Sequence, residues 1–223
     1  MRKTLLTIST LFAVSATAGA QATSTRLRVE PGSELSIAGT SNVHDFHCKT
    51  NKFSAYIDVD PGYTRDLTKV ARPIVSVNVV IAVRSLSCGN KKMDENMYST
   101  LKADKNQIIR YTLSGYDILN GSATAFAAKT TGTLTILGKE KVVAMKIDAA
   151  RLNDGKATAQ GEETLLMSEF GIKPPSFMFG TMKVGDEIKV KFNLKVGPEM
   201  IAQLVAATTK PLPALTPNTS IAR

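Results

Sequence analysis

The sequence predicts an all-β fold: an extended antiparallel β-barrel of about eight strands with one or two short helices. Three turn signals, Asn120-Gly121, Gly138-Lys139 and Asp154-Gly155, separate long runs of alternating apolar and polar residues. Such pairs tolerate positive φ and are typical of two-residue hairpin turns. At about 3.3 Å a residue and a tilt of about 40°, the runs between them would build a tube about 35 Å tall.

Residues 1–20 carry the pattern of a secretory signal peptide: basic residues, an apolar stretch, and the small-residue cleavage site Ala18-Gly19-Ala20. The apolar stretch is shorter than the roughly 20 residues that span a bilayer. We therefore expect a cleaved signal over residues 1–20, a barrel domain over residues 21–205, and a disordered Pro/Thr-rich tail over residues 206–223.

Alternation of apolar and polar side chains marks the strands. The clearest run ends the barrel, where Ile188, Val190 and Phe192 alternate with charged residues. Strands with one apolar and one polar face fit an antiparallel barrel or sandwich. We expect strands near residues 25–30, 34–41, 45–60, 72–87, 107–119, 122–137, 140–153 and 156–163, with a ninth candidate at residues 186–196.

Helix is scarce. Met93, Met97 and Leu101 lie four residues apart, which places them on one stripe of a helix that follows the N-cap candidate Asn90. We expect this helix to cover an end or edge of the barrel, with its Met stripe packed in the core rather than against a ligand. The expected helices are residues 92–103 and residues 198–207.

Cys48 and Cys88 are the only cysteines. In an exported protein an even pair most often forms a structural disulfide. A redox role is the rival interpretation, but the chain has no C-x-x-C motif. The sequence therefore favours a structural bond between Cys48 and Cys88.

The formal net charge of +9 raises the question of an acidic partner. The sequence has none of the motifs typical of nucleic-acid binding, so we expect no nucleic-acid partner. Transient attraction to an anionic membrane surface is one use of the charge. A surface that merely keeps the protein soluble is an equally good explanation.

The two histidines, His44 and His47, lie beside Asp45 and Cys48. On a strand, His44 and Cys48 would share one face while His47 would point to the other. Because tetrahedral zinc would then need ligands from elsewhere, we expect no metal. His44 and Asp45 are instead candidates for hydrogen bonds at the barrel rim or with the polar end of a ligand.

Signals of catalysis are weak. The chain has no G-x-S-x-G elbow, P-loop or G-x-G-x-x-G motif. Glu162-Glu163 and Asp186-Glu187 are adjacent carboxylates, but such pairs are usually solvated. We expect no enzyme activity, no catalytic residue and no cofactor.

The segment from Met167 to Phe179 concentrates large apolar side chains around Pro174-Pro175, which enforces an extended loop. Two interpretations remain open. The segment is either a plug packed over the barrel end or an apolar flap at a mouth through which a lipid chain enters. Its large apolar residues are Phe170, Phe177, Met178 and Phe179.

Taken in order, several short motifs resemble the YceI family of exported polyisoprenoid-binding proteins. Each motif is weak alone, but their order and spacing extend over residues 25–196. Two departures concern polar contacts: Phe46 stands where the family often has Trp, and Asn96 where many members have His. The motifs are Gly39–Phe46, Ser85-Leu86, Met93–Leu101, Gly132–Gly138, Phe170–Pro175 and Val184–Ile188.

The resemblance implies a lipocalin-like barrel whose apolar lumen holds a polyisoprenoid lipid, such as a quinone precursor or a prenyl phosphate, without catalysis. It also implies a periplasmic binding or carrier protein. The alternative is a non-catalytic stress-related or surface interaction module whose barrel is filled by its own side chains.

Alternation also indicates which side chains face inward. Together with the aromatic residues of the apolar segment, they are the candidate lipid contacts: Phe46, Phe53, Ile57, Val77, Val79, Ile81, Tyr111, Leu113, Met145, Ile147, Phe170, Phe177, Phe179, Val190, Phe192 and Leu194.

Overall fold

A computed structural model describes residues 24–64, 72–122 and 124–199. Within these ranges the chain is mostly β-strand, with one α-helix, α1 (Lys91–Thr100), and short 3-10 turns. The predicted signal peptide, the tail and nearly all of the second predicted helix lie outside the described residues. The strands are β1 (Thr25–Val29), β2 (Glu34–Ser41), β3 (Phe46–Thr50), β4 (Phe53–Val59), β5 (Ile74–Ala82), β6 (Ile108–Gly121), β7 (Ala125–Ile136), β8 (Lys139–Arg151), β9 (Ala157–Leu166), β10 (Ser176–Phe177) and β11 (Met182–Pro198).

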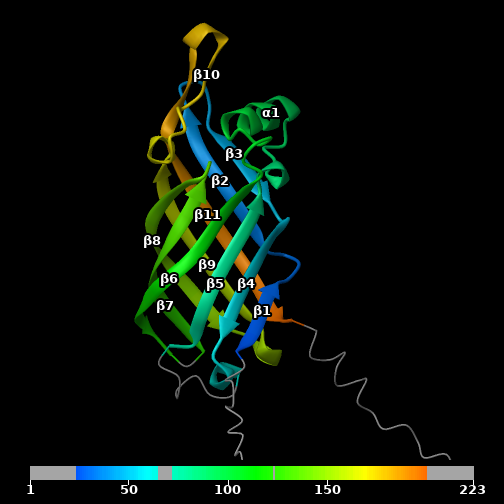
Figure 1. The fold of residues 1–223 in the computed structure, drawn as a ribbon, viewed down its shortest axis with the longest axis vertical. Coiled ribbons are helices and arrows are strands. Elements are labelled where there is room, and N and C mark those ends of the chain that lie inside the picture. The colour runs from blue at the N-terminus through cyan, green and yellow to red at the C-terminus, as the bar shows by residue number, and fades with distance from the viewer. Residues whose placement is uncertain (1–23, 65–71, 123, 200–223) are drawn as a thin grey trace, which may run out of the picture.

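The strands close into a barrel, which confirms the predicted fold class. Eight of them form an antiparallel ring in the order β1, β4, β5, β6, β7, β8, β9 and β11, and β11 returns to pair with β1. Figure 1 shows the barrel upright, with α1 and β10 at one end, called here the helix end, and β1 toward the other, the β1 end. Closure leaves the ring without an open edge.

β2 and β3 complete the wall toward the helix end. β11 is long enough to pair with β1 over Val196–Pro198 and with β2 between Val184 and Asn193. β1 and β2 therefore run as one interrupted strand, and β3 and β4 do the same. The predicted strand over residues 45–60 is broken at Asn51-Lys52, because the Thr50 hydroxyl accepts the Lys52 amide at 2.9 Å.

The strand predicted over residues 72–87 is also too long. β5 ends at Ala82 and the chain turns through a 3-10 segment, Val83–Ser85. The Ser85 hydroxyl donates to the Ala82 carbonyl at 2.7 Å, which closes this turn. The turn directs the chain over the helix end and buries Val83 and Leu86 there.

Two of the three predicted turns connect strands. Asp154 (φ 60°) and Gly155 (φ 72°) turn the chain between β8 and β9 as expected. The β7–β8 turn falls one residue earlier than predicted: Leu137 (φ 53°) and Gly138 (φ 72°) form it, and Lys139 already belongs to β8. Positive φ at both central residues is what a tight hairpin requires.

The turn predicted at Asn120-Gly121 is wrong. Both residues lie in β6, where Gly121 pairs with Phe126. The connection to β7 instead begins at Ser122, whose hydroxyl accepts the Ala125 amide at 3.2 Å. Local side-chain hydrogen bonding of this kind forms a turn without an Asn-Gly pair.

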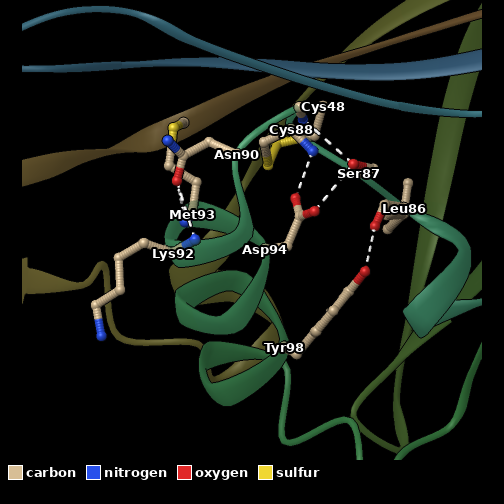
Figure 2. Close-up of a disulfide and its surroundings, with 10 residues drawn as sticks. Cys48, Leu86, Ser87, Cys88, Asn90, Lys92, Met93, Asp94 and Tyr98 are labelled. Atoms are coloured by element: carbon tan, nitrogen blue, oxygen red, sulfur yellow. Dashed lines mark hydrogen bonds between the residues drawn. A yellow bond between two sulfur atoms is a disulfide. The ribbon is translucent and has the colours of Figure 1, made fainter.

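Helix α1 is fastened across the helix end (Figure 2). The Asn90 side chain caps it by accepting the amides of Lys92 at 2.9 Å and Met93 at 3.2 Å, as the sequence predicts. Asp94 accepts the Cys88 amide at 2.6 Å, and the Tyr98 hydroxyl donates to the Leu86 carbonyl at 2.6 Å. The start and the middle of the helix are thus both bonded to the segment that precedes it.

The predicted disulfide is present: Cys48 on β3 is bonded to Cys88, two residues before the helix cap. The Lys49 amide donates to the Ser87 carbonyl at 2.8 Å, and the Ser87 amide donates to the Lys49 carbonyl at 2.9 Å. This short bridge and the covalent bond together hold the β3 edge against the helix segment.

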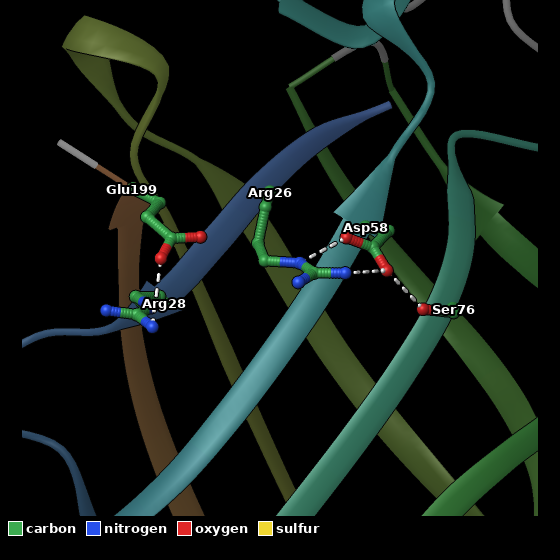
Figure 3. A network of polar contacts seen from close by, with 5 residues as sticks. All are labelled: Arg26, Arg28, Asp58, Ser76 and Glu199. Atoms are coloured by element: carbon green, nitrogen blue, oxygen red, sulfur yellow. Dashed lines mark hydrogen bonds and ion pairs between the residues drawn. The ribbon is translucent and has the colours of Figure 1, made fainter. Parts of the chain in front are cut away.

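Polar contacts on the outer face connect β1 to the strands on both of its sides (Figure 3). The Arg26 guanidinium on β1 donates to both carboxylate oxygens of Asp58 on β4, at 2.7 and 3.1 Å, and the Ser76 hydroxyl on β5 donates to the same carboxylate at 2.7 Å. These hydrogen bonds lower the pKa of Asp58. Arg28 pairs with Glu199 at 2.9 Å, just beyond β11.

We expect a Cys48→Ala/Cys88→Ala protein to fold but to be less stable. The bond closes a 40-residue separation, and its loss should lower the free energy of unfolding by about 3–4 kcal/mol. Denaturant unfolding of both proteins, with and without reductant, measures this. Reductant should lower the midpoint of the wild type only. Equal midpoints under oxidising conditions would refute a stabilising role.

Candidate functional site

Two buried apolar clusters close the interior. The helix-end cluster includes Val83, Leu86 and Phe170, and Met97 and Leu101 of the α1 segment pack against it. The β1-end cluster consists of Leu27, Ile57, Val59, Ala157, Leu194 and Val196. These clusters contribute apolar burial to the free energy of folding and close the barrel without filling its middle.

Between the clusters lies a cavity of about 220 Å³, to which every strand of the ring contributes lining residues. Many inward side chains, including Val77, Leu113 and Phe192, are only half-buried because they face this space. An engineered apolar cavity of about 150 Å³ is already large enough to bind benzene. The interior is therefore hollow rather than filled by its own side chains.

Inward glycines keep the space open. A Cβ on Gly132 would lie 2.5 Å from Cζ of Tyr111, and a Cβ on Gly161 would lie 2.7 Å from Cζ of Phe192. Each ring therefore lies directly over a glycine of the neighbouring strand, against the wall of the lumen. The side chains missing at Gly132 and Gly161 give the rings room against the wall.

Most of the predicted lipid contacts do line this cavity, because alternation correctly assigns the inward face. The exceptions are Phe46, Phe170, Phe177 and Phe179. The predicted residues in the cavity wall are Phe53, Ile57, Val77, Val79, Ile81, Tyr111, Leu113, Met145, Ile147, Val190, Phe192 and Leu194.

The four exceptions lie toward the helix end. Phe46 packs its ring over Gly39, and Phe177 is half-buried in the short strand β10. Phe170 is buried in the helix-end cluster, whereas Phe179 is fully exposed, at φ 57°, in the β10–β11 connection. The apolar segment thus combines a plug residue, Phe170, with an outward aromatic side chain, Phe179.

Glu163 corrects an expectation drawn from the sequence. Glu162 is solvated and pairs with Lys189 at 3.1 Å and Lys191 at 2.6 Å. Glu163, its neighbour, faces the cavity, and burial raises the pKa of its carboxyl. Alternation along β9 could have predicted this inward position, because Gly161, Glu163 and Leu165 share a face.

Tyrosine hydroxyls are the other notable polar groups in the wall. The Tyr116 hydroxyl accepts the Ile74 amide at 3.0 Å. The Tyr111 hydroxyl is buried and has no hydrogen-bond partner within the described part of the chain. Burial raises the pKa of Tyr111, and nearby Thr130 partly offsets this rise. The Thr130 hydroxyl itself donates to the Met145 carbonyl at 3.1 Å.

A family model for the YceI-like domain matches residues 14–196. The chain belongs to the YceI-like family. This confirms the resemblance carried by the six sequence motifs. No curated protein matches the chain.

Solved structures share the fold of this YceI-like chain. Burkholderia cenocepacia BcnA is 24% identical with a TM-score of 0.61, over 75% of this chain and 98% of BcnA. A polyisoprenoid binding domain from Saccharophagus degradans, implicated in plant cell wall breakdown, is 11% identical with a TM-score of 0.60, over 79% of this chain and 100% of that domain. The Campylobacter jejuni YCEI protein is 20% identical with a TM-score of 0.54, over 68% and 84%.

His44 and Asp45 are exposed in the β2–β3 connection of this YceI-like barrel. That connection is bonded to the start of β11, because Asn42 donates to the Thr181 carbonyl and accepts the Lys183 amide, each at 2.7 Å. His44 and Asp45 thus lie at the rim of the helix end. Among the described residues, no three His, Cys, Asp or Glu side chains are grouped to hold a metal ion.

No helix within the described ranges is long and apolar enough to cross a membrane.

We expect Glu163→Gln to raise the melting temperature at pH 7. A carboxyl whose folded pKa is raised costs folding free energy once it ionises, so this cost disappears below the unfolded pKa of about 4.3. The gain should therefore fade as the pH falls toward 4. Thermal unfolding between pH 4 and pH 7 measures it.

Glu162→Gln is the matched control, because the two lysines lower the pKa of Glu162. A lowered folded pKa adds stability above the unfolded pKa, so this variant should melt no higher than the wild type at pH 7. A Glu163→Gln protein less stable than the wild type at pH 7 would contradict the inward placement of the Glu163 carboxyl.

Proposed function

We propose that this protein binds a polyisoprenoid lipid in its barrel lumen and carries or sequesters it in the periplasm after export. The hollow apolar lumen between the two buried clusters is the observation that carries the proposal. Membership of the YceI-like family supports it, as does the fold shared with a polyisoprenoid binding domain. Both also favour a binding protein over an enzyme.

The physical basis of binding is removal of apolar surface from water. A slender chain gains about 25 cal/mol per Å² of buried apolar area, from which the cost of association is subtracted. This recognition requires no reactive side chain and no cofactor. It does require open space, which is the cavity that the half-buried inward residues line.

The signal-peptide pattern of residues 1–20 is the reason that the proposal includes export to the periplasm. A cleaved signal would place the barrel in an oxidising compartment, in keeping with the Cys48–Cys88 bond. An anionic membrane surface is the proposed transient partner for lipid exchange. The net charge of +9 and the exposed ring of Phe179 support this part of the proposal.

The alternative is an interaction module with a barrel filled by its own side chains. The cavity of about 220 Å³ is evidence against such a filled interior. We therefore favour lipid binding.

Protein purified from its native host should carry an extractable prenyl lipid. Native mass spectrometry should show a species heavier than the polypeptide, which loses the added mass after solvent extraction. The mature polypeptide incubated with prenyl lipid should regain that mass. A bare polypeptide mass before and after incubation would refute lipid binding.

Phe192→Asp should abolish lipid uptake, because it places a charge in the apolar lumen. Asn193→Asp is the matched control: it introduces the same residue one position along β11 on the exposed face, and it should bind normally. Uptake of a fluorescent prenyl analogue measures both. Unchanged uptake by Phe192→Asp would place the ligand outside the lumen.

Val77→Phe tests the same site without adding a charge. Val77 lines the cavity and is half-buried, so a larger ring would occupy ligand space. Uptake should fall about tenfold or more while circular dichroism and cooperative unfolding are retained. Normal uptake by this variant would count against occupation of the lumen.

A further inference from the structure

Tyr111 and Glu163 are polar side chains in the mostly apolar wall of the same cavity, which also contains Tyr116, Thr130 and Thr158. The Tyr116 and Thr130 hydroxyls already have hydrogen-bond partners in the protein. The Tyr111 hydroxyl is a buried donor without a partner in the described residues. Buried polar groups are normally hydrogen-bonded, so the Tyr111 hydroxyl lacks a contact that a ligand would supply.

The Glu163 carboxyl has a hydrogen bond from the Thr164 backbone and no side-chain cation within the described residues, whereas its outward neighbour Glu162 has two lysine partners. The Glu163 carboxyl has two oxygens and can accept further hydrogen bonds besides the one from Thr164.

Strand register places the two groups near one another. Thr130 on β7 pairs with Met145 on β8. The β8–β9 ladder pairs Lys146 with Glu162, so Met145 falls beside Glu163 in the next position. Two strand spacings, about 10 Å, therefore separate the backbones of Thr130 and Glu163.

The Tyr111 ring shortens this separation. From β6 it reaches across Gly132 on β7, where its Oη would lie 2.5 Å from a Cβ on that glycine. Its hydroxyl approaches Thr130 closely enough to affect the Tyr111 pKa. The hydroxyl and the Glu163 carboxyl thus project from opposite sides of Met145 into one stretch of lumen.

The charge of this stretch restricts what it can hold. No Lys, Arg or His is among the described residues that line the cavity. A phosphate here would meet the Glu163 carboxyl without a cation, at low dielectric, where like charges repel strongly. An uncharged oxygen meets no such penalty: the Tyr111 hydroxyl donates to it, and Glu163 accepts from a hydroxyl or, when protonated, donates to a carbonyl.

We propose that Tyr111 and Glu163 form an internal recognition point for an uncharged oxygen-bearing group of the lipid, an alcohol or a carbonyl, and that the lumen selects such lipids over phosphorylated ones. This inference rests on the proposed function, because it presumes that a lipid occupies the lumen. It adds the class of head group that the lumen accepts and the side chains that select it.

The test compares three ligands of equal chain length: geranylgeraniol, geranylgeranyl phosphate and the corresponding hydrocarbon. Competition against a bound fluorescent prenyl probe gives the dissociation constants. The wild type should bind the alcohol about tenfold more tightly than the hydrocarbon, the gain expected of one or two buried hydrogen bonds, and more tightly than the phosphate.

Tyr111→Phe and Glu163→Leu should each reduce the preference for alcohol over hydrocarbon by about fivefold and leave hydrocarbon binding unchanged. Glu163→Leu should also narrow the preference for alcohol over phosphate. Tyr98→Phe and Glu162→Leu are the matched controls outside the cavity lining, and they should retain both preferences. Tyr111→Phe removes only an unpartnered hydroxyl, so folding should survive.

The outcomes separate this inference from the proposed function. Equal affinity of the wild type for all three ligands leaves lipid binding intact and overturns the recognition point. Unchanged preferences in both Tyr111→Phe and Glu163→Leu do the same. Failure of the wild type to bind any of the three ligands overturns the proposed function and the inference together.

Discussion

The pairing of β11 with β1 is the constraint on which the molecule depends. It turns a sheet with two open edges into a closed wall, and closure assigns every second side chain to an enclosed interior. The length of β11 permits this, because one end pairs with β1 while the rest pairs with β2. The Arg28–Glu199 ion pair supports this seam from outside, and the Arg26–Asp58 contact joins β1 to its other neighbour, β4 (Figure 3).

Given that closure, the lumen is explained by the size of the inward residues. The two clusters bury their side chains at the ends, while Gly132 and Gly161 let aromatic rings lie against the wall between them. Met145, Phe192 and their neighbours therefore keep apolar surface that faces the lumen and that no other side chain covers. An apolar chain is the natural complement to that surface. Recognition would then rest on the shape of the lumen and on burial of apolar area, without a reactive side chain.

Periodicity alone predicts much of this. Phe192, Val190 and Leu194 can be assigned to the interior because β11 alternates cleanly, and the Asn90 cap identifies the helix start. Periodicity does not reveal where a ladder ends. Asn120-Gly121 has the composition of a turn, yet tertiary pairing with β7 keeps it in β6. Thr50 interrupts a pattern that otherwise continues without a break.

The site was harder to predict than the fold, for two physical reasons. As adjacent carboxylates, Glu162 and Glu163 both suggest a solvated face, although neighbouring strand residues must point to opposite faces. Phe170 and Phe179 look equivalent in sequence, but one is buried at the helix end and the other is exposed, because a loop has no periodicity to separate them. His44 and Asp45 reach the rim through a turn whose position depends on hydrogen bonds of Asn42 to a strand far along the chain.

The most direct test of the central claim is a crystal structure of the protein purified from its own host without delipidation. The account predicts continuous, elongated electron density along the lumen between the two clusters, in contact with Met145 and Phe192. A lumen collapsed onto its own side chains, or one holding only ordered water, would contradict it.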